Sequence, residues 1–142
     1  MEYTASIRST PGSHEVTVTA GGQDRALDLP AREGAPGSAV SGGELLFLAL
    51  ATCATNDVYR EAAARSLPVV GVDVEVAGWF DAPGARARDV SYRVSVVSPA
   101  PEEQVRELVA HVDAIAEVHR TLRTGTTVSL EEVRVSRPPE PS

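Results

Sequence analysis

The sequence predicts an α+β fold, in which hairpins of antiparallel strands accompany two helices. Three observations indicate it. Alternating segments rich in β-branched residues recur along the chain, a long apolar segment covers residues 41–67, and an amphipathic pattern covers residues 101–122. The 142 residues are enough for one domain with its own core. We expect this domain to span residues 1–137 and residues 138–142 to form a disordered tail.

Three strands are expected before the long helix. Residues 2–8 and 14–20 alternate, and Pro-Gly-Ser at 11–13 supplies a hairpin turn between them. Residues 25–29 follow as a third, shorter strand. Residues 30–43 hold two prolines and four glycines, which is typical of an irregular loop. This loop either drapes over a functional site or simply connects the third strand to the helix.

The central helix is predicted from its start signal and its apolar run. Ser41 followed by Glu44 is a capping-box signature. Residues 45–54 contain no charge, so we expect this part of the helix to be buried all round. Its apolar length of roughly 15 Å is far too short for a bilayer. The second half of the helix is expected to lie at the surface and to end at Pro68. Its polar residues indicate this, namely Asn56, Asp57, Arg60 and Glu61.

The second half of the chain reads as a hairpin, a helix and a strand. Residues 69–80 and 88–97 alternate on either side of a turn. Residues 101–122 place apolar side chains at helical spacing, with Gly125 after them. Residues 127–135 are expected to form the last strand. Because so small a chain cannot surround a wholly buried helix, an obligate homodimer with the central helices packed between the sheets is expected.

Composition excludes several classes of function. The net charge of −7 argues against nucleic-acid partners and against binding to an anionic membrane. All 13 basic residues are arginine, which rules out Schiff-base lysines and the P-loop lysine. The polar N-terminus lacks the apolar run of a signal peptide, and one cysteine cannot form an internal disulfide. A cytoplasmic protein is therefore expected, without a cofactor.

Cys53 is the one candidate nucleophile. Its apolar surroundings in the middle of a helix disfavour a thiolate. Asp57, one turn away, would also disfavour it, whereas Arg60 would favour it. Free cysteines are usually small buried apolar residues, so a reactive thiol and a packing residue both stay open.

No metal site is expected. His111 and His119 are eight residues apart, which is not the i, i+4 spacing of paired helix ligands. We interpret both, with Asp113 and Glu117, as solvated polar residues of the second helix. Trp79 and Phe80 are interpreted as core or dimer contacts.

Two segments carry a resemblance to a known family. The runs GGELLFLALATC (42–53) and AEVHRTL (116–122), together with the order of elements from Tyr3 to Val135, resemble the OsmC/Ohr family of osmotically inducible and organic-hydroperoxide-resistance proteins. The resemblance implies an OsmC-like fold and an intertwined homodimer with two long helices at its centre.

The resemblance also implies a peroxiredoxin-like thiol chemistry. In active members a first cysteine, matching Cys53, attacks the peroxide and becomes a sulfenic acid. A second cysteine then closes a disulfide, but its position is occupied here by Ala116. The family's activating glutamate falls on Gly43, and Glu44 is better explained as a cap. The activating arginine would be Arg25 or Arg32, of which Arg32 is the candidate carried forward.

Three hypotheses follow. The first is a stress-response protein that reduces small organic hydroperoxides through Cys53 alone, with an external thiol as reductant. The second is a non-catalytic protein that binds a hydrophobic small molecule in the dimer cleft, where Phe47, Asp57 and Trp79 are candidate binding residues. In the third, Cys53 only packs and the dimer serves another interaction.

Overall fold

The structure is a computed structural model that describes residues 1–139. It is a mixed α+β fold with antiparallel sheets, as the sequence predicts. In chain order the elements are β1 (Tyr3–Thr10), β2 (Ser13–Ala20), β3 (Gln23–Leu27), α1 (Gly42–Ala64), β4 (Gly71–Trp79), β5 (Arg88–Val97), α2 (Glu102–Ile115) and α3 (Glu117–Thr124).

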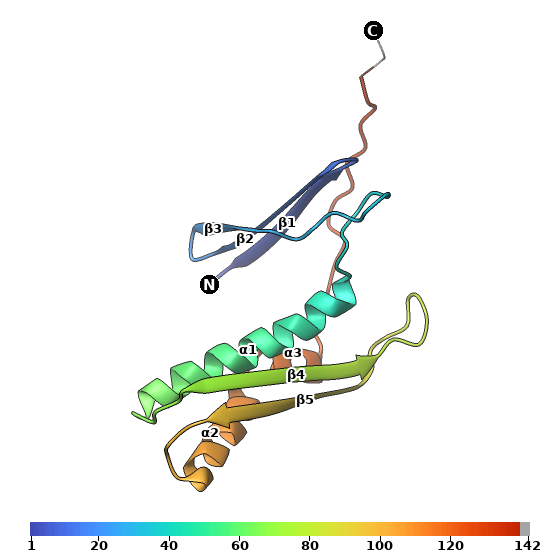
Figure 1. The fold of residues 1–142 in the computed structure, drawn as a ribbon. Coiled ribbons are helices and arrows are strands. Elements are labelled where there is room, and N and C mark those ends of the chain that lie inside the picture. The colour runs from blue at the N-terminus through green and yellow to red at the C-terminus, as the bar shows by residue number, and fades with distance from the viewer. Residues whose placement is uncertain (140–142) are drawn as a thin grey trace.

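The core lies between α1, α2 and the β4–β5 hairpin. Val58 and Ala62 of α1 meet Leu108 and Val112 of α2 there, with Leu67 beside them. Alternate valines of the two strands pack against this cluster, since alternate side chains of a strand share one face. The helix α3 also contacts α1, and Figure 1 shows α1 running the length of the hairpin.

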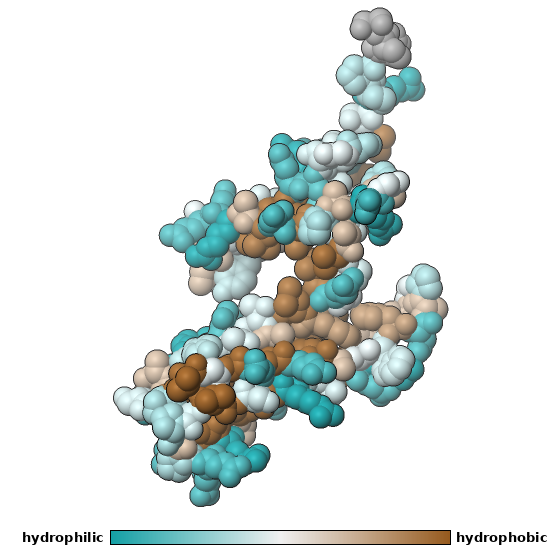
Figure 2. Space-filling view, in the orientation of Figure 1, coloured by the Kyte–Doolittle hydropathy of each residue, from teal (hydrophilic) through white to brown (hydrophobic). Residues whose placement is uncertain are grey.

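The strands β1, β2 and β3 form a separate three-stranded antiparallel sheet. All of β1 is exposed, and Val16 is the buried residue of this sheet. Figure 1 shows the sheet standing off the face of α1, and Figure 2 shows open space between the two parts of the chain. Within one chain, this sheet therefore leaves most of its apolar side chains uncovered.

The local start and turn signals are confirmed. Ser41 is the N-cap of α1: its Oγ accepts from the Glu44 N–H at 3.1 Å, and the Glu44 carboxylate accepts from the Ser41 N–H at 3.1 Å. The third strand begins two residues earlier than expected, at Gln23. Gly21 and Gly22 both have positive φ and make a two-residue turn, which sets Ala20 opposite Gln23.

The prediction of one helix over residues 101–122 is wrong at Ala116. This residue has an extended backbone (φ −58°, ψ 124°) that ends α2 and begins α3. Alanine is a good helix former, so propensity does not cause the break. Arg123 reaches back across it and donates to the Asp113 main-chain oxygen at 2.9 Å and to its carboxylate at 2.7 Å. Tertiary contacts of α3 therefore replace the continuous helix.

The prediction of a last strand over residues 127–135 is also wrong for the single chain. The segment has no strand pairing, and its apolar side chains, Val128, Leu130, Val133 and Val135, are all at least 70% exposed. A strand exists only through hydrogen bonds to a neighbour, and the described chain provides none here. The expected tail at 138–142 lies mostly outside the described residues, since 140–142 are not among them.

The burial of α1 differs from the prediction in both halves. Among residues 45–54 only Leu50 and Ala54 are buried, and Leu48 is 56% exposed, because no part of residues 1–139 covers that face. In the second half, Asp57 is 5% exposed rather than at the surface. Asn56 and Arg60 are exposed as predicted, and the second half of α1 packs on α2 through Val58 and Ala62. No helix in the described part of the chain is long and apolar enough to cross a membrane.

Candidate functional site

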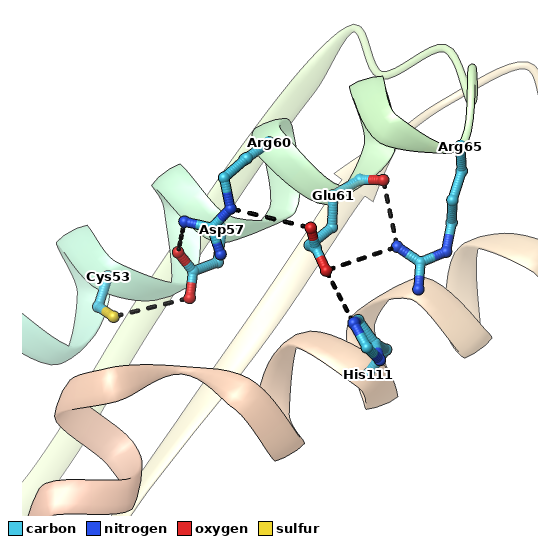
Figure 3. Close-up of polar contacts among 6 residues, drawn as sticks. All are labelled: Cys53, Asp57, Arg60, Glu61, Arg65 and His111. Atoms are coloured by element: carbon cyan, nitrogen blue, oxygen red, sulfur yellow. Dashed lines mark hydrogen bonds and ion pairs between the residues drawn. The ribbon is translucent and has the colours of Figure 1, made fainter.

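Cys53 and Asp57 form the centre of the candidate site. They lie one turn apart on α1, and the Cys53 Sγ donates to Asp57 Oδ2 at 3.8 Å (Figure 3). Cys53 is half-buried and is a free thiol, while Asp57 is buried. The thiol therefore has a carboxylate as its polar partner.

Arg60 directs its charge at Asp57. Its Nη1 lies 2.8 Å from Asp57 Oδ1, and its Nε lies 3.8 Å from Glu61 Oε2. The Glu61 Oε1 atom in turn lies 2.7 Å from Nε2 of His111 on α2 and 3.8 Å from Nη1 of Arg65 (Figure 3). A row of alternating charges thus runs along α1 from Cys53 to the α1–α2 contact. The arginine that the sequence suggested as a thiolate partner neutralises Asp57.

His119 occupies the buried face of α3, which contacts α1. It is 3% exposed, and neither ring nitrogen has a hydrogen-bond partner within residues 1–139. The interpretation of His119 as a solvated polar residue is wrong. Ala116, which the resemblance to the OsmC/Ohr family suggests as a resolving position, lies three residues before it and is fully buried.

Burial decides the charge of His119. Desolvation is the largest cause and lowers its pKa, and the charge of Arg123 lowers it further. Asp113 and Asp57 act in the opposite direction without outweighing these two causes. The imidazole is therefore neutral at pH 7, with one N–H donor and one acceptor nitrogen.

A polar network fixes the other side of His119. Its ring meets Tyr92 of β5 edge to face, with the centroids 4.7 Å apart. The Tyr92 hydroxyl donates to Asp113, which also pairs with Arg123. Burial is the largest cause that raises the pKa of Tyr92, and its hydrogen bond to Asp113 raises that pKa further. The hydrogen bonds that Tyr92 and Arg123 donate to Asp113 lower the pKa of its carboxyl group. Tyr92 stays protonated and Asp113 stays ionised, so the network holds the ring from this side.

The aromatic candidates lie apart from Cys53, at the start of α1 and the end of β4. Phe47 stacks on Phe80, with the centroids 5.6 Å apart and the rings at 26°. Trp79 is 62% exposed, and the Arg88 guanidinium lies 5.4 Å from its ring centroid. These contacts make an aromatic surface and not an enclosed pocket.

Arg32 is not brought to Cys53 within one chain. It is exposed and lines a hollow between its own loop and the β1–β2 turn at residues 9–13. Its N–H donates to the Gly37 oxygen at 2.7 Å, which closes that loop on itself. Its role as thiolate activator stays a prediction.

A groove of about 660 Å³ runs between β5 and α2. Valines from both elements line it, among them Val94, Val96 and Val105. Tyr92 and Asp113 also line it, and Arg106 and Glu102 add charge to its walls. Among the described residues, no cluster of three or more His, Cys, Asp or Glu side chains is arranged to hold a metal.

Sequence reasoning missed the cluster that His119, Tyr92 and Asp113 form. The available signal was the position of His119 one turn after Ala116, inside the segment that resembles the family. Tyr92 lies in β5, where the alternation of apolar and polar residues indicates only which face of the strand its side chain is on. Its meeting with α3 depends on how the hairpin packs.

The fold and the site together describe a small α+β protein that carries one free thiol, Cys53, on its central helix. The chain belongs to the OsmC-like protein family, whose sequence model matches residues 35–131. A search of curated proteins by sequence found no match.

Solved structures of the same family share the fold. An OsmC-like protein from Mycoplasma pneumoniae has a TM-score of 0.64 at 20% identity, covering 87% of this chain and 88% of that one. An OsmC-like hydroperoxide resistance protein from Jannaschia has a TM-score of 0.54 at 17% identity, covering 89% and 87%. The organic hydroperoxide resistance protein OhrB of Bacillus subtilis has a TM-score of 0.50 at 18% identity, covering 84% and 90%.

Proposed function

We propose that this protein reduces organic hydroperoxides through Cys53, with an external thiol as reductant. The observation that carries the proposal is the placement of the chain's one thiol on α1, half-buried and hydrogen-bonded to Asp57, in a chain of the OsmC-like family. Two proteins that share its fold are described as organic hydroperoxide resistance proteins, from Bacillus subtilis and Legionella pneumophila.

The reaction needs only one cysteine. The Cys53 thiolate attacks the distal peroxide oxygen, the O–O bond breaks, and the products are the sulfenic acid of Cys53 and an alkoxide that takes a proton to become the alcohol. An external thiol then condenses with the sulfenic acid, releasing water and leaving a mixed disulfide. A second external thiol attacks this disulfide and restores Cys53. Ala116 has no sulfur, so the external thiol takes the place of a resolving cysteine.

Hydroperoxide consumption by Cys53→Ser tests the proposal. The wild-type protein should consume cumene hydroperoxide in the presence of a dithiol, and Cys53→Ser should not. Gln104→Ala changes an exposed residue of α2 and should behave as the wild type. A wild-type protein as inert as Cys53→Ser would end the proposal.

A second candidate is non-catalytic binding of a hydrophobic small molecule. The valine-lined groove between β5 and α2 favours it. Val109→Arg would place a charge in the groove wall, and it should abolish thermal stabilisation by a medium-chain alcohol. If no alkyl compound stabilises the wild-type protein, the groove does not serve this function.

We also propose that the protein is a homodimer. The uncovered face of α1, the open sheet of β1–β3 and the unpaired segment at residues 127–135 support it. Exposed apolar patches of this extent are unusual on a monomer, since covering them with a second copy removes them from water.

A further inference from the structure

The Cys53 thiol and the Asp57 carboxylate form a hydrogen-bonded pair on α1. The thiol donates to Asp57 Oδ2 at 3.8 Å, and the Asp57 side chain is only 8% exposed (Figure 3). A thiolate at Cys53 would stand beside this carboxylate, and two like charges so close together repel each other, more strongly where water is excluded. The carboxylate therefore favours the neutral thiol over the thiolate that attacks a hydroperoxide.

Arg60 limits this repulsion without removing it. Its Nη1 lies 2.8 Å from Asp57 Oδ1, the carboxylate oxygen that does not accept from the thiol. The Arg60 side chain is 61% exposed, so water screens its charge. His119 of α3 also lies in the field of Asp57, but it is neutral at pH 7. Arg60 is therefore the cation that sets how strongly Asp57 repels a thiolate.

The distance between Cys53 and Asp57 also suits the oxidised form of the cysteine. A sulfenic acid adds a hydroxyl to Sγ, and an O–H···O⁻ hydrogen bond spans about 2.5–2.7 Å between its two oxygens. Because Sγ and Oδ2 are 3.8 Å apart, the hydroxyl fits between them, bonded to the first and donating to the second. Asp57 thus accepts a hydrogen bond from the neutral sulfenic acid and repels the sulfenate anion.

We propose that Asp57 holds Cys53 in its neutral forms, thiol before oxidation and sulfenic acid after it, so that oxidation stops at the sulfenic acid. The inference rests on the proposed function. The step that Asp57 slows is attack of the sulfenate on a second hydroperoxide. A second S–O bond forms, the O–O bond breaks, and the products are the sulfinic acid and the alcohol. Sulfur loses an electron pair in this step and the hydroperoxide gains it.

The single cysteine makes this protection useful. A second thiol in the chain would capture the sulfenic acid as a disulfide, but Cys53 is the one cysteine and Ala116 has no sulfur. The sulfenic acid must therefore wait for an external thiol while excess hydroperoxide is still present. The sulfinic acid cannot be reduced by thiols, so forming it would end the activity of the molecule. Asp57 slows the first oxidation and keeps its product reducible.

Alkylation of Cys53 by iodoacetamide at pH 7 tests the effect on the thiol. Asp57→Asn keeps the shape of the side chain and removes its charge, so the rate should rise about 10-fold. Arg60→Gln leaves the Asp57 charge unpaired, so the rate should fall below that of the wild type. A variant that merely loosened α1 would expose the thiol and raise the rate in both cases. Asp73→Asn, the same change at an exposed position of β4, should match the wild type.

Over-oxidation tests the effect on the sulfenic acid. Reduced protein is treated with an excess of cumene hydroperoxide in the absence of any thiol. The sulfenic acid is trapped with dimedone, and the sulfinic acid is followed by intact mass. The sulfenic acid should persist in the wild type, whereas Asp57→Asn should convert it to the sulfinic acid about 10-fold faster. Equal rates of this conversion in the two proteins would overturn the inference.

Turnover of hydroperoxide with a dithiol separates this inference from the proposed function, because neither assay of Asp57 contains a reductant. Faster alkylation and faster over-oxidation of Asp57→Asn, with no turnover by the wild type, would support the role of Asp57 and end the peroxidase proposal. A wild-type Cys53 that the hydroperoxide does not oxidise would overturn both.

Two measurements cover the case in which Asp57→Asn does not fold. Arg60 is exposed, so Arg60→Gln should fold, and an alkylation rate at or above that of the wild type would overturn the inference. A wild-type protein that reaches the sulfinic acid as fast as it is first oxidised would also overturn it.

Discussion

The burial of His119 links the protonation of one residue to the stability of the whole chain. Burial and Arg123 lower its pKa below the ordinary value of 6.5, so the unfolded chain binds this proton more readily than the folded one. Its contribution to stability is therefore complete above about pH 6.5 and is lost as the pH falls from there toward the folded pKa.

We predict that His119→Phe flattens the pH dependence of stability. Between pH 7.5 and 5, the free energy of unfolding of the wild type should fall more steeply than that of the variant, as measured by urea denaturation. The carboxyls whose pKa is lowered, Asp113 and Glu44, titrate below this window and do not interfere. Equal slopes for the two proteins would show that folding does not lower the pKa of His119.

Gly78 is a second residue whose neighbours fix its identity. A Cβ there would lie 2.8 Å from Phe47 Cζ and 3.1 Å from Val90 Cγ2, with no positive φ to consider. We predict that Gly78→Ala shifts the Phe47–Phe80 stack and costs about 1–3 kcal/mol in the free energy of unfolding. Gly71→Ala, at the other end of β4, meets nothing within 4 Å and should not destabilise. A stable Gly78→Ala protein would mean that Phe47 moves aside freely.

At the scale of elements, α1 depends on its capping box. Ser41 satisfies the Glu44 N–H, and Glu44 returns the bond to the Ser41 N–H. We predict that Ser41→Ala lowers the free energy of unfolding by about 1 kcal/mol in urea denaturation. Ser129→Ala, in the exposed C-terminal segment, should leave it unchanged. No difference between the two variants would show that the tertiary contacts of α1 hold its first turn without the cap.

Some features of the helices and strands can be predicted from the sequence, and others cannot. The N-cap, the hairpin strands and the turn at Gly21 and Gly22 depend on residues a few positions apart, and each could be predicted or explained locally. The break at Ala116 could not, because alanine favours helix. It depends on contacts of α3 with α1 and on Arg123 reaching Asp113.

At the scale of the molecule, the uncovered surfaces lead to a test of the homodimer. We predict a mass in solution of twice the 14.9 kDa of one chain, measured by light scattering after gel filtration. Leu130→Asp should shift the equilibrium toward monomer, because it charges an exposed apolar side chain of the unpaired segment 127–135. Ser129→Asp, whose side chain points away from that of Leu130 in an extended segment, is the matched control and should stay dimeric. A monomeric wild type would contradict the proposal.

The candidate site could be predicted only in part. Cys53 and Asp57 are one helical turn apart, so the sequence alone placed them together. It also placed Asp57 at the surface, which the structure corrects, and it gave His119 no role. Burial of both side chains depends on which faces of α1 and α3 meet.

The sequence by itself determined the α+β class, the central helix with its cap, the hairpins and the position of the one thiol. These features depend on local hydrogen bonds and on the period of apolar residues, which are written in adjacent positions. The tertiary structure alone decided the break at Ala116, the burial of Asp57 and His119, and the absence of pairing at residues 127–135 within one chain. Each of these depends on contacts between elements that are far apart in the sequence, and such contacts cannot be predicted from a short segment.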